Sequence, residues 1–205
     1  MWYIYYPSGD GKDLATQRPH VLKGKCFLHH SNSDPHIQSN STGSATPWDS
    51  FSYLATLTSV WGIDGSIVRF STWGNYFVYS CFFDSLQSLC IAPLTSPGKI
   101  GTSKVLSTLT NSWETVGNPV IEGPATMYRE GKTFLSYSAS YCWKSSYSLG
   151  LLTWNGSGDP SFSASWKKSG PLITGANGNY GTGNNGYDIS CATSPPFYYG
   201  DHVSR

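Results

Sequence analysis

Hydrophobic and polar residues alternate over short stretches of this chain, and turn-forming residues separate those stretches. Two examples are 74–80 (GNYFVYS) and 131–138 (GKTFLSYS), where a turn glycine and a polar residue lead into an aromatic strand. Alternation with a period of two is typical of β-strands, whereas helical periodicity is nearly absent from the chain. The pattern therefore predicts an all-β fold.

The two stretches belong to a longer repeat in which each unit holds four predicted strands. One unit covers 63–70, 76–82, 89–94 and 104–113, and the next covers 121–128, 133–138, 148–154 and 165–173. An earlier unit, without its first strand, supplies 2–6, 18–22 and 51–57, and a later unit begins near 186–190. Four-stranded repeats are typical of β-propeller blades, and the alternative is a β-sandwich with coincidental hairpins.

A chain of 205 residues is long enough for one sizeable domain, and we predict a single incomplete propeller domain over 1–205. The stretch 26–48 is rich in His, Ser and Asn, which predicts a surface-loop insertion. Its pair His29-His30 has no third ligand at a recognisable spacing, so no metal site is predicted there.

Charge and hydropathy exclude several kinds of partner. Lys and Arg total 13 and Asp and Glu total 12, so neither nucleic acid nor an anionic membrane is an expected partner. No apolar run reaches the roughly 18 residues that a membrane span needs. The first six residues, MWYIYY, do not resemble a signal peptide. Incomplete sheets would leave strand edges open, so the expected state is a monomer or self-association through those edges.

The five cysteines show no metal-binding spacing, and their odd number leaves at least one thiol unpaired. Cys81 and Cys90 fall on neighbouring predicted strands. They either form a disulfide or remain buried free thiols.

Two acids occupy similar places in consecutive repeats, each followed by glycine at the start of a strand. Asp64 lies in WGIDGSI and Glu122 in PVIEGPA. Apolar neighbours and a second carboxylate both raise the pKa of a glutamic acid, so Glu122 is a candidate proton donor. The alternatives are a strand-edge glutamate and a turn aspartate, because Asp-Gly is a common turn pair.

Glycoside hydrolysis uses two carboxyl groups of opposite protonation state, and aromatic rings stack on sugar faces. The chain contains 15% aromatic residues, most of which are expected in the core. The candidates for sugar binding are Trp61, Trp73, Tyr137, Tyr141 and Trp143.

An ordered set of segments resembles glycoside hydrolase family 43, which includes arabinanases, α-L-arabinofuranosidases and β-xylosidases. The resemblance runs from about residue 1 to residue 190, and no single motif in it is specific. The segments that carry it are 61–65, 88–94, 122–125, 137–140, 149–152, 165–168 and 181–186.

The resemblance implies a five-bladed β-propeller, of which this chain represents about three to four blades. It implies a secreted enzyme that cleaves arabinose- or xylose-containing plant cell-wall polysaccharides with inversion, arabinan being the expected substrate. It also implies that Glu122 is the general acid and that Asp64 orients it and tunes its pKa.

Two departures from the family pattern bear on activity. The family's general base is an Asp on the first strand of the first blade, and the repeat places that strand before Met1. The alternative to an active enzyme is therefore an inactive carbohydrate-binding propeller or a truncated fragment that lacks the base.

The second departure is at Asn184, in Gly181-Thr182-Gly183-Asn184-Asn185, where the family commonly has a His. The resemblance implies that no cofactor is required. In arabinanase members that His helps to hold an ion, often calcium, in the central channel, and an Asn oxygen is also a calcium ligand.

Overall fold

The computed structural model describes residue 50 and residues 52–184 with their side chains. It also describes the backbone of five short segments, 18–22, 25–31, 37–41, 185–186 and 199–200. Among these residues the helical segments are two 3-10 turns, η1 (Ser112–Thr115) and η2 (Ser163–Ser165). None of the described helices is long and apolar enough to cross a membrane. The described part of the chain is all-β, as predicted.

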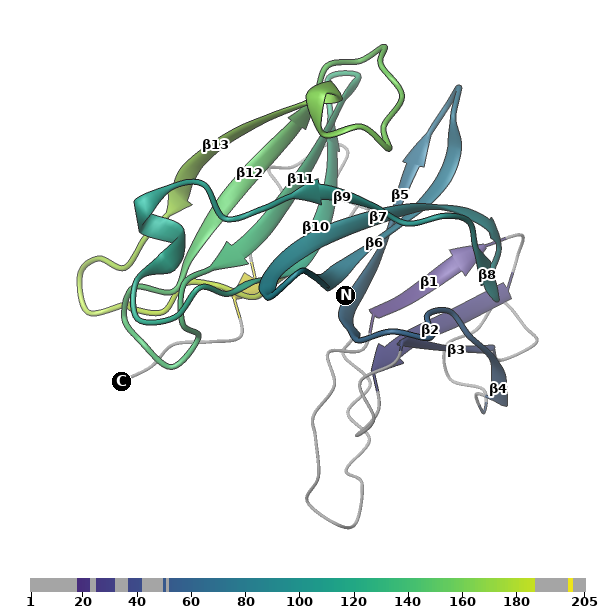
Figure 1. Ribbon diagram of the computed structural model, residues 1–205, viewed down its shortest axis with the longest axis horizontal. Helices are drawn as coiled ribbons and strands as arrows, with labels where there is room; N and C mark the ends of the chain where they lie inside the picture. Colours follow the sequence, from purple (N-terminus) through teal and green to yellow (C-terminus); the bar gives the residue numbers. More distant parts are fainter. Residues whose placement is uncertain are drawn as a thin grey trace.

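The strands form three antiparallel sheets in chain order, followed by one short hairpin (Figure 1). The first sheet holds β1 (Arg18–Leu22), β2 (Lys25–Ser31), β3 (Ile37–Ser41) and β4 (Ser52–Thr56). The second holds β5 (Gly62–Phe70), β6 (Gly74–Phe83), β7 (Leu86–Ser96), β8 (Lys99–Ile100) and β9 (Lys104–Ser107). The third holds β10 (Ile121–Arg129), β11 (Lys132–Ala139), β12 (Ser148–Trp154) and β13 (Trp166–Ile173). The hairpin is β14 (Asn185–Gly186) with β15 (Tyr199–Gly200).

The second and third sheets confirm the two predicted four-stranded units. In each unit the chain runs up and down through neighbouring strands, in the order β5-β6-β7-β9 and β10-β11-β12-β13. The extra strand β8 pairs with the end of β7 before the chain returns as β9.

The first sheet corrects one prediction. The stretch 26–48, expected to be a surface loop, contains most of β2 and all of β3, and these two strands complete a four-stranded sheet with β1 and β4. Polar composition was misleading because backbone pairing, rather than side-chain hydrophobicity, defines these strands. His29 and His30 lie in β2, and the predicted strand 2–6 lies outside the described residues.

The second sheet is apolar on both faces. Alternate residues of a strand point to opposite sides of the sheet, and here both sets include buried hydrophobic residues. Val68 and Val78 join a core shared with the third sheet, including Leu135 and Tyr137. Their chain neighbours Ile67 and Phe77 join a second core on the other face. The sheet is thus packed from both sides, as a propeller blade is by its neighbours.

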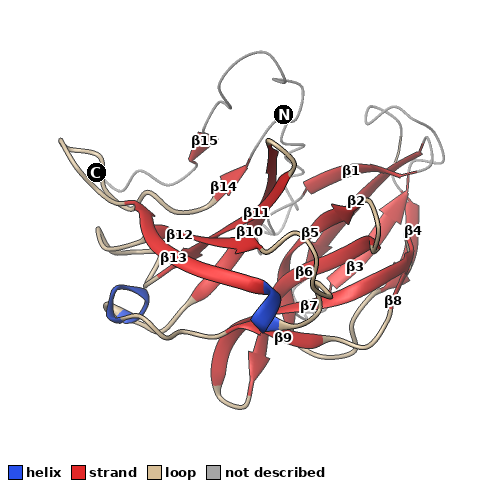
Figure 2. Cartoon of the chain, turned by 90° about the horizontal axis from the view of Figure 1, so that it is seen from above, coloured by secondary structure: helices blue, strands red, loops and turns tan. Residues whose placement is uncertain are grey.

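Three hydrogen bonds join β5 to β10, and each links residues 59 positions apart. The N–H of Gly123 donates to Asp64, the hydroxyl of Thr126 donates to the carbonyl of Ile67, and the N–H of Arg69 donates to the hydroxyl of Tyr128; the donor–acceptor distances are 3.0, 3.2 and 2.6 Å. A constant separation means that equivalent positions of consecutive first strands lie side by side. Figure 2 shows β14 continuing this series beyond β10 and β11, both of which it contacts.

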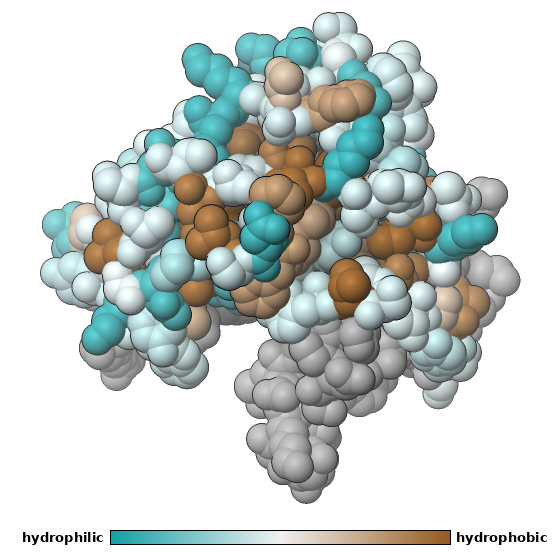
Figure 3. All heavy atoms as spheres, viewed as in Figure 1, coloured by the Kyte–Doolittle hydropathy of each residue, from teal (hydrophilic) through white to brown (hydrophobic). Residues whose placement is uncertain are grey.

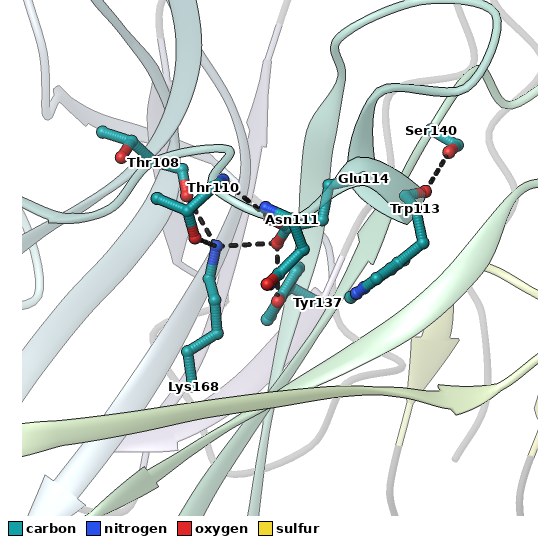
Figure 4. Close-up of polar contacts among 8 residues, drawn as sticks. All are labelled: Thr108, Thr110, Asn111, Trp113, Glu114, Tyr137, Ser140 and Lys168. Carbon is teal, nitrogen blue, oxygen red and sulfur yellow. Dashed lines mark hydrogen bonds and ion pairs between the residues drawn. The ribbon is translucent and has the colours of Figure 1, made fainter.

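A buried ion pair fixes the linker between the second and third sheets (Figure 4). Oε1 of Glu114, which is fully buried, accepts from Lys168 Nζ at 2.7 Å and from the Tyr137 hydroxyl at 2.8 Å. Oε2 accepts from the main-chain N–H groups of Thr110 and Asn111. Burial raises the pKa of Glu114, but these four hydrogen bonds outweigh it and hold that pKa below its usual value.

Candidate active site

The two candidate acids lie at matching irregularities in β5 and β10. In β5 the register with β6 shifts between Ile63 and Ser66, and in β10 the register with β11 shifts between Glu122 and Ala125. Each shift places an extra residue in the first strand of its sheet, and such bulges redirect side chains.

The bulges correct the assumed equivalence of the two acids. The pairing of Ile63 with Ser80 corresponds to that of Glu122 with Ser138, so Glu122 occupies the place of Ile63. Asp64 is equivalent to Gly123, and both have left-handed backbones, with φ of 57° and 60°. This conformation favours glycine, and Asp is among the few other residues that adopt it readily.

The two acids nevertheless interact electrostatically, because the offset places Asp64 against Gly123, the residue that follows Glu122. Oδ2 of Asp64 accepts the N–H of Gly123 at 3.0 Å, and Asp64 is buried. Glu122 is half-buried, and its Oε1 accepts a hydrogen bond from the hydroxyl of Tyr147 at 2.8 Å. The carboxyl group of Glu122 is therefore held through Oε1 by Tyr147.

The pKa of Glu122 is raised to about 7. Burial is the main cause, and the negative charge of Asp64 adds to it. Hydrogen bonds from Tyr147 and Gln87 partly offset the rise because they stabilise the ionised form. A carboxyl group of this kind is protonated in a large share of molecules near neutral pH, as a proton donor must be.

Tyr147 and Gln87 were not predicted as site residues. They stand just before matching Ser-Leu pairs in the repeat, in Gln87-Ser88-Leu89 and Tyr147-Ser148-Leu149. Extending the predicted strands 89–94 and 148–154 toward the N-terminus, by two residues and by one, would have included both. A Gln and a Tyr at matching positions do not look alike in sequence, which is why the repeat alone did not single them out.

Of the five sugar-binding candidates, Trp61 and Tyr141 lie at the site end of their strands. Trp61 immediately precedes β5, is half-buried, and contacts Phe82 with ring centroids 4.6 Å apart. Tyr141 is half-buried and follows β11 two residues after Ala139, which pairs with Ile121 beside Glu122. Their role in sugar binding stays a prediction.

The structure corrects two of the remaining three candidates, Tyr137 and Trp73. Tyr137 is fully buried and donates its hydroxyl to Glu114, so its ring cannot stack on a sugar. Trp73 lies in the turn after β5, at the far end of the strand from Asp64, roughly 20 Å away at about 3.3 Å per residue. Trp143, which is 70% exposed, lies five residues after Ser138 in the loop between β11 and β12.

Exposed hydrophobic side chains are not restricted to this end of the molecule. The face seen in Figure 3 shows hydrophobic residues scattered between hydrophilic ones. Phe82, Phe83 and Leu86, at the β6–β7 hairpin, are each between 44% and 50% exposed. This hairpin adjoins Gln87 and therefore borders the candidate site.

Asn184 lies beside Gly123 and, like Asp64 and Gly123, has a left-handed backbone. Its φ is 54°, and its N–H donates to the hydroxyl of Ser138 at 2.6 Å. Within the described residues no group of three or more His, Cys, Asp or Glu side chains is arranged to hold a metal. An ion in the central channel therefore stays a prediction from the family resemblance.

The cysteines near the site separate into a bonded pair and a free thiol. Cys81 and Cys90 form a disulfide between β6 and β7, which resolves the alternatives left open by the sequence. Cys142 is free and half-buried, and its pKa is raised by burial and by the negative charge of Glu122. The disulfide ties together the two strands that carry Ser80 and Gln87.

Comparisons with known proteins identify the family to which the chain belongs. The family model for glycosyl hydrolases family 43 matches residues 1–189. The extracellular exo-alpha-(1->5)-L-arabinofuranosidase of Streptomyces avermitilis is 36% identical over 193 residues, covering 92% of this chain and 37% of that protein. Alpha-L-arabinofuranosidase B of Pyricularia oryzae is 33% identical, with the same two coverages. The chain thus spans little more than a third of the length of these curated relatives.

Solved structures show the same fold. An alpha-L-arabinofuranosidase from Lactobacillus brevis superposes with a TM-score of 0.78 at 20% identity, covering 92% of this chain and 67% of that one. An endo-1,4-beta-xylanase from Bacteroides thetaiotaomicron gives a TM-score of 0.73 at 24% identity, covering 84% and 60%. With the family model matching most of its length, the chain belongs to glycosyl hydrolases family 43.

Proposed function

We propose that this chain carries the general acid of an inverting glycoside hydrolase that acts on arabinose- or xylose-containing plant cell-wall polysaccharides. The observation that carries the proposal is the carboxyl group of Glu122, a half-buried residue whose pKa is raised to about 7 by burial and by the charge of Asp64. Arabinan is the first substrate to test, because the relatives from Streptomyces avermitilis and Pyricularia oryzae are named arabinofuranosidases.

In the proposed reaction, Glu122 gives its proton to the oxygen that leaves as the glycosidic bond to C1 breaks. A water molecule attacks C1 from the opposite face and loses its proton to a general base, so the configuration inverts. The base of an inverting enzyme lies roughly 6.5–9.5 Å from the acid, which leaves room for the water. We propose that this base lies outside the described side chains, while Glu122 is the acid and Asp64 its neighbouring carboxylate.

The same reasoning extends to architecture and location. The second sheet, packed on both faces, supports a propeller, and we propose that the complete domain closes with five blades. We further propose secretion, since two arabinofuranosidase relatives from Streptomyces are named extracellular.

The test is release of arabinose from debranched arabinan and from 4-nitrophenyl α-L-arabinofuranoside by the full chain. Glu122→Gln keeps the shape of the side chain but removes the transferable proton, so activity on arabinan should fall by about 10²–10⁴-fold. Glu130→Gln is the matched control, because Glu130 is an exposed residue at the far β10–β11 turn. Proton NMR of the first sugar released would report inversion or retention at C1.

Equal loss in both variants, or no loss in Glu122→Gln, would contradict the assignment of the acid. If the folded wild-type chain has no activity, calorimetric titration with arabino-oligosaccharides tests the alternative of a non-catalytic binding propeller. Binding without turnover would replace the enzyme proposal, and neither binding nor turnover would reject both.

A further inference from the structure

Two side chains at equivalent places in consecutive sheets hold the carboxyl group of Glu122. Tyr147 donates its hydroxyl to Oε1 at 2.8 Å, and the side chain of Gln87 also hydrogen bonds to Glu122. Each stands two residues before a leucine that pairs with a serine of the neighbouring strand. These pairs are Ser80–Leu89 and Ser138–Leu149.

On the Tyr147 side, hydrogen bonds form a directed chain. Ser138 accepts the N–H of Asn184 at 2.6 Å and hydrogen bonds through its side chain to Tyr147. Since Tyr147 donates its single hydroxyl proton to Glu122, it accepts the proton of Ser138. Oε1 of Glu122 therefore accepts a hydrogen bond from a hydroxyl whose own orientation is set by Ser138.

On the Gln87 side, the preceding sheet fixes both the backbone and the side chain around Glu122. Nε2 of Gln87 donates to the hydroxyl of Ser80 at 2.9 Å. Ser80 in turn donates to the carbonyl of Ile121, the residue before Glu122, at 2.6 Å. An amide nitrogen has two protons, so one can serve Ser80 while the other serves Glu122.

Packing leaves the ring of Tyr147 little freedom. Tyr147 is only 2% exposed, and Gly183 lies so close that a side chain at that position would overlap the ring. The hydroxyl is thus held in place by the segment that leads into β14. A fixed donor directs a carboxyl group better than a mobile one, because no ordering is required during the reaction.

We propose that Tyr147 and Gln87 are positioning residues that orient the carboxyl group of Glu122 for proton transfer. The inference rests on the proposed role of Glu122 as general acid. It adds that the acid depends on donors from two consecutive sheets, so the junction between the second and third sheets belongs to the catalytic apparatus.

The test compares Tyr147→Phe and Gln87→Leu in the full chain. Carbon NMR of labelled glutamate carboxyl groups, with Glu122→Gln identifying the resonance, follows the titration of Glu122 without requiring turnover. Each variant removes a donor to the ionised carboxylate, so the titration midpoint should rise by about one pH unit. Tyr128→Phe is the matched control, because the Tyr128 hydroxyl contacts Arg69 instead.

A second readout uses arabinofuranosides that differ in leaving group. Help from a general acid matters most when the leaving group is poor. In Tyr147→Phe, kcat should therefore fall about tenfold or more for an alkyl arabinofuranoside and much less for the 4-nitrophenyl compound. A merely structural role would lower both rates equally.

Unchanged titration of Glu122 in both variants would overturn the inference, as would a shift of the same size in Tyr128→Phe. A shifted midpoint with equal losses for both substrates would also overturn the positioning role. If the wild-type chain hydrolyses nothing, the proposed function fails, while the NMR titration still reports whether Tyr147 and Gln87 hold the carboxyl group.

Discussion

The main-chain N–H of Gly123 donates a hydrogen bond of 3.0 Å to Oδ2 of Asp64. The bond joins equivalent positions of β10 and β5, both in the left-handed region. It anchors the backbone directly after Glu122 to a negative charge in the preceding sheet. Asp64 thus has two separable effects on Glu122, one through geometry and one through charge.

Asp64→Asn separates these effects, because an amide oxygen still accepts the N–H of Gly123 while the negative charge is lost. The charge of Asp64 raises the pKa of Glu122, so that pKa should fall below its value of about 7 in the variant. A general acid works only while protonated, so the alkaline limb of the pH–rate profile should move to lower pH. Steady-state rates between pH 4 and 9 measure the shift.

Glu130→Gln removes the same charge from an exposed residue far from the site and should leave the profile in place. If the alkaline limb of the Asp64→Asn profile lies at the same pH as in wild type, the charge of Asp64 does not act on the catalytic acid. Asp64→Ala, which removes both the charge and the acceptor, should reduce the rate further than Asp64→Asn does.

Glu122 should reduce stability at alkaline pH. Its folded pKa of about 7 lies above the usual value of 4.5, so the folded state holds this proton more tightly than the unfolded state does. The free energy of unfolding therefore falls as the pH rises from 4.5 through 7. Glu122→Gln should be more stable than wild type by up to about 3 kcal/mol at pH 8, and close to it at pH 4.

Urea unfolding of both proteins at the two pH values measures this difference. Glu130→Gln again controls for the loss of one charge. An equal gain at pH 4 and pH 8 would trace the effect to packing rather than to ionisation. We expect wild type to be less stable than Glu122→Gln at pH 8 only. Such a loss of stability is common where a functional site needs a residue with a perturbed pKa.

The sequence predicted most of the second and third sheets because alternation and turn residues are local signals. Glu122 was singled out by its apolar neighbours, and its pKa is raised mainly by burial. The one-residue offset of Asp64 was not predictable, because a bulge depends on pairing with the next strand. The burial of Tyr137 was missed for a similar reason, since its partner Glu114 lies 23 residues away on a linker.

Lys168 should be essential to stability even though it lies outside the site. Lys168→Met would leave the fully buried Glu114 without its cation, and breaking a buried pair costs about 3–5 kcal/mol. Lys167→Met is the matched control, since Lys167 is exposed and adjacent. Urea unfolding measures both, and Lys168→Met combined with Glu114→Gln should recover part of the loss. Equal small effects of the two single variants would contradict the importance of the buried pair.

The disulfide between Cys81 and Cys90 should stabilise the strand pair that carries Ser80 and Gln87. It closes a loop with a sequence separation of 9, for which the chain-entropy relation gives about 2–3 kcal/mol. Cys81→Ser combined with Cys90→Ser should lower the free energy of unfolding by that amount, and reductant should destabilise wild type but not the double variant. Cys142→Ser is the control, because replacing this free thiol leaves the disulfide in place and should leave the response to reductant unchanged. Wild type that unfolds at the same urea concentration with and without reductant would contradict a stabilising role for the bond.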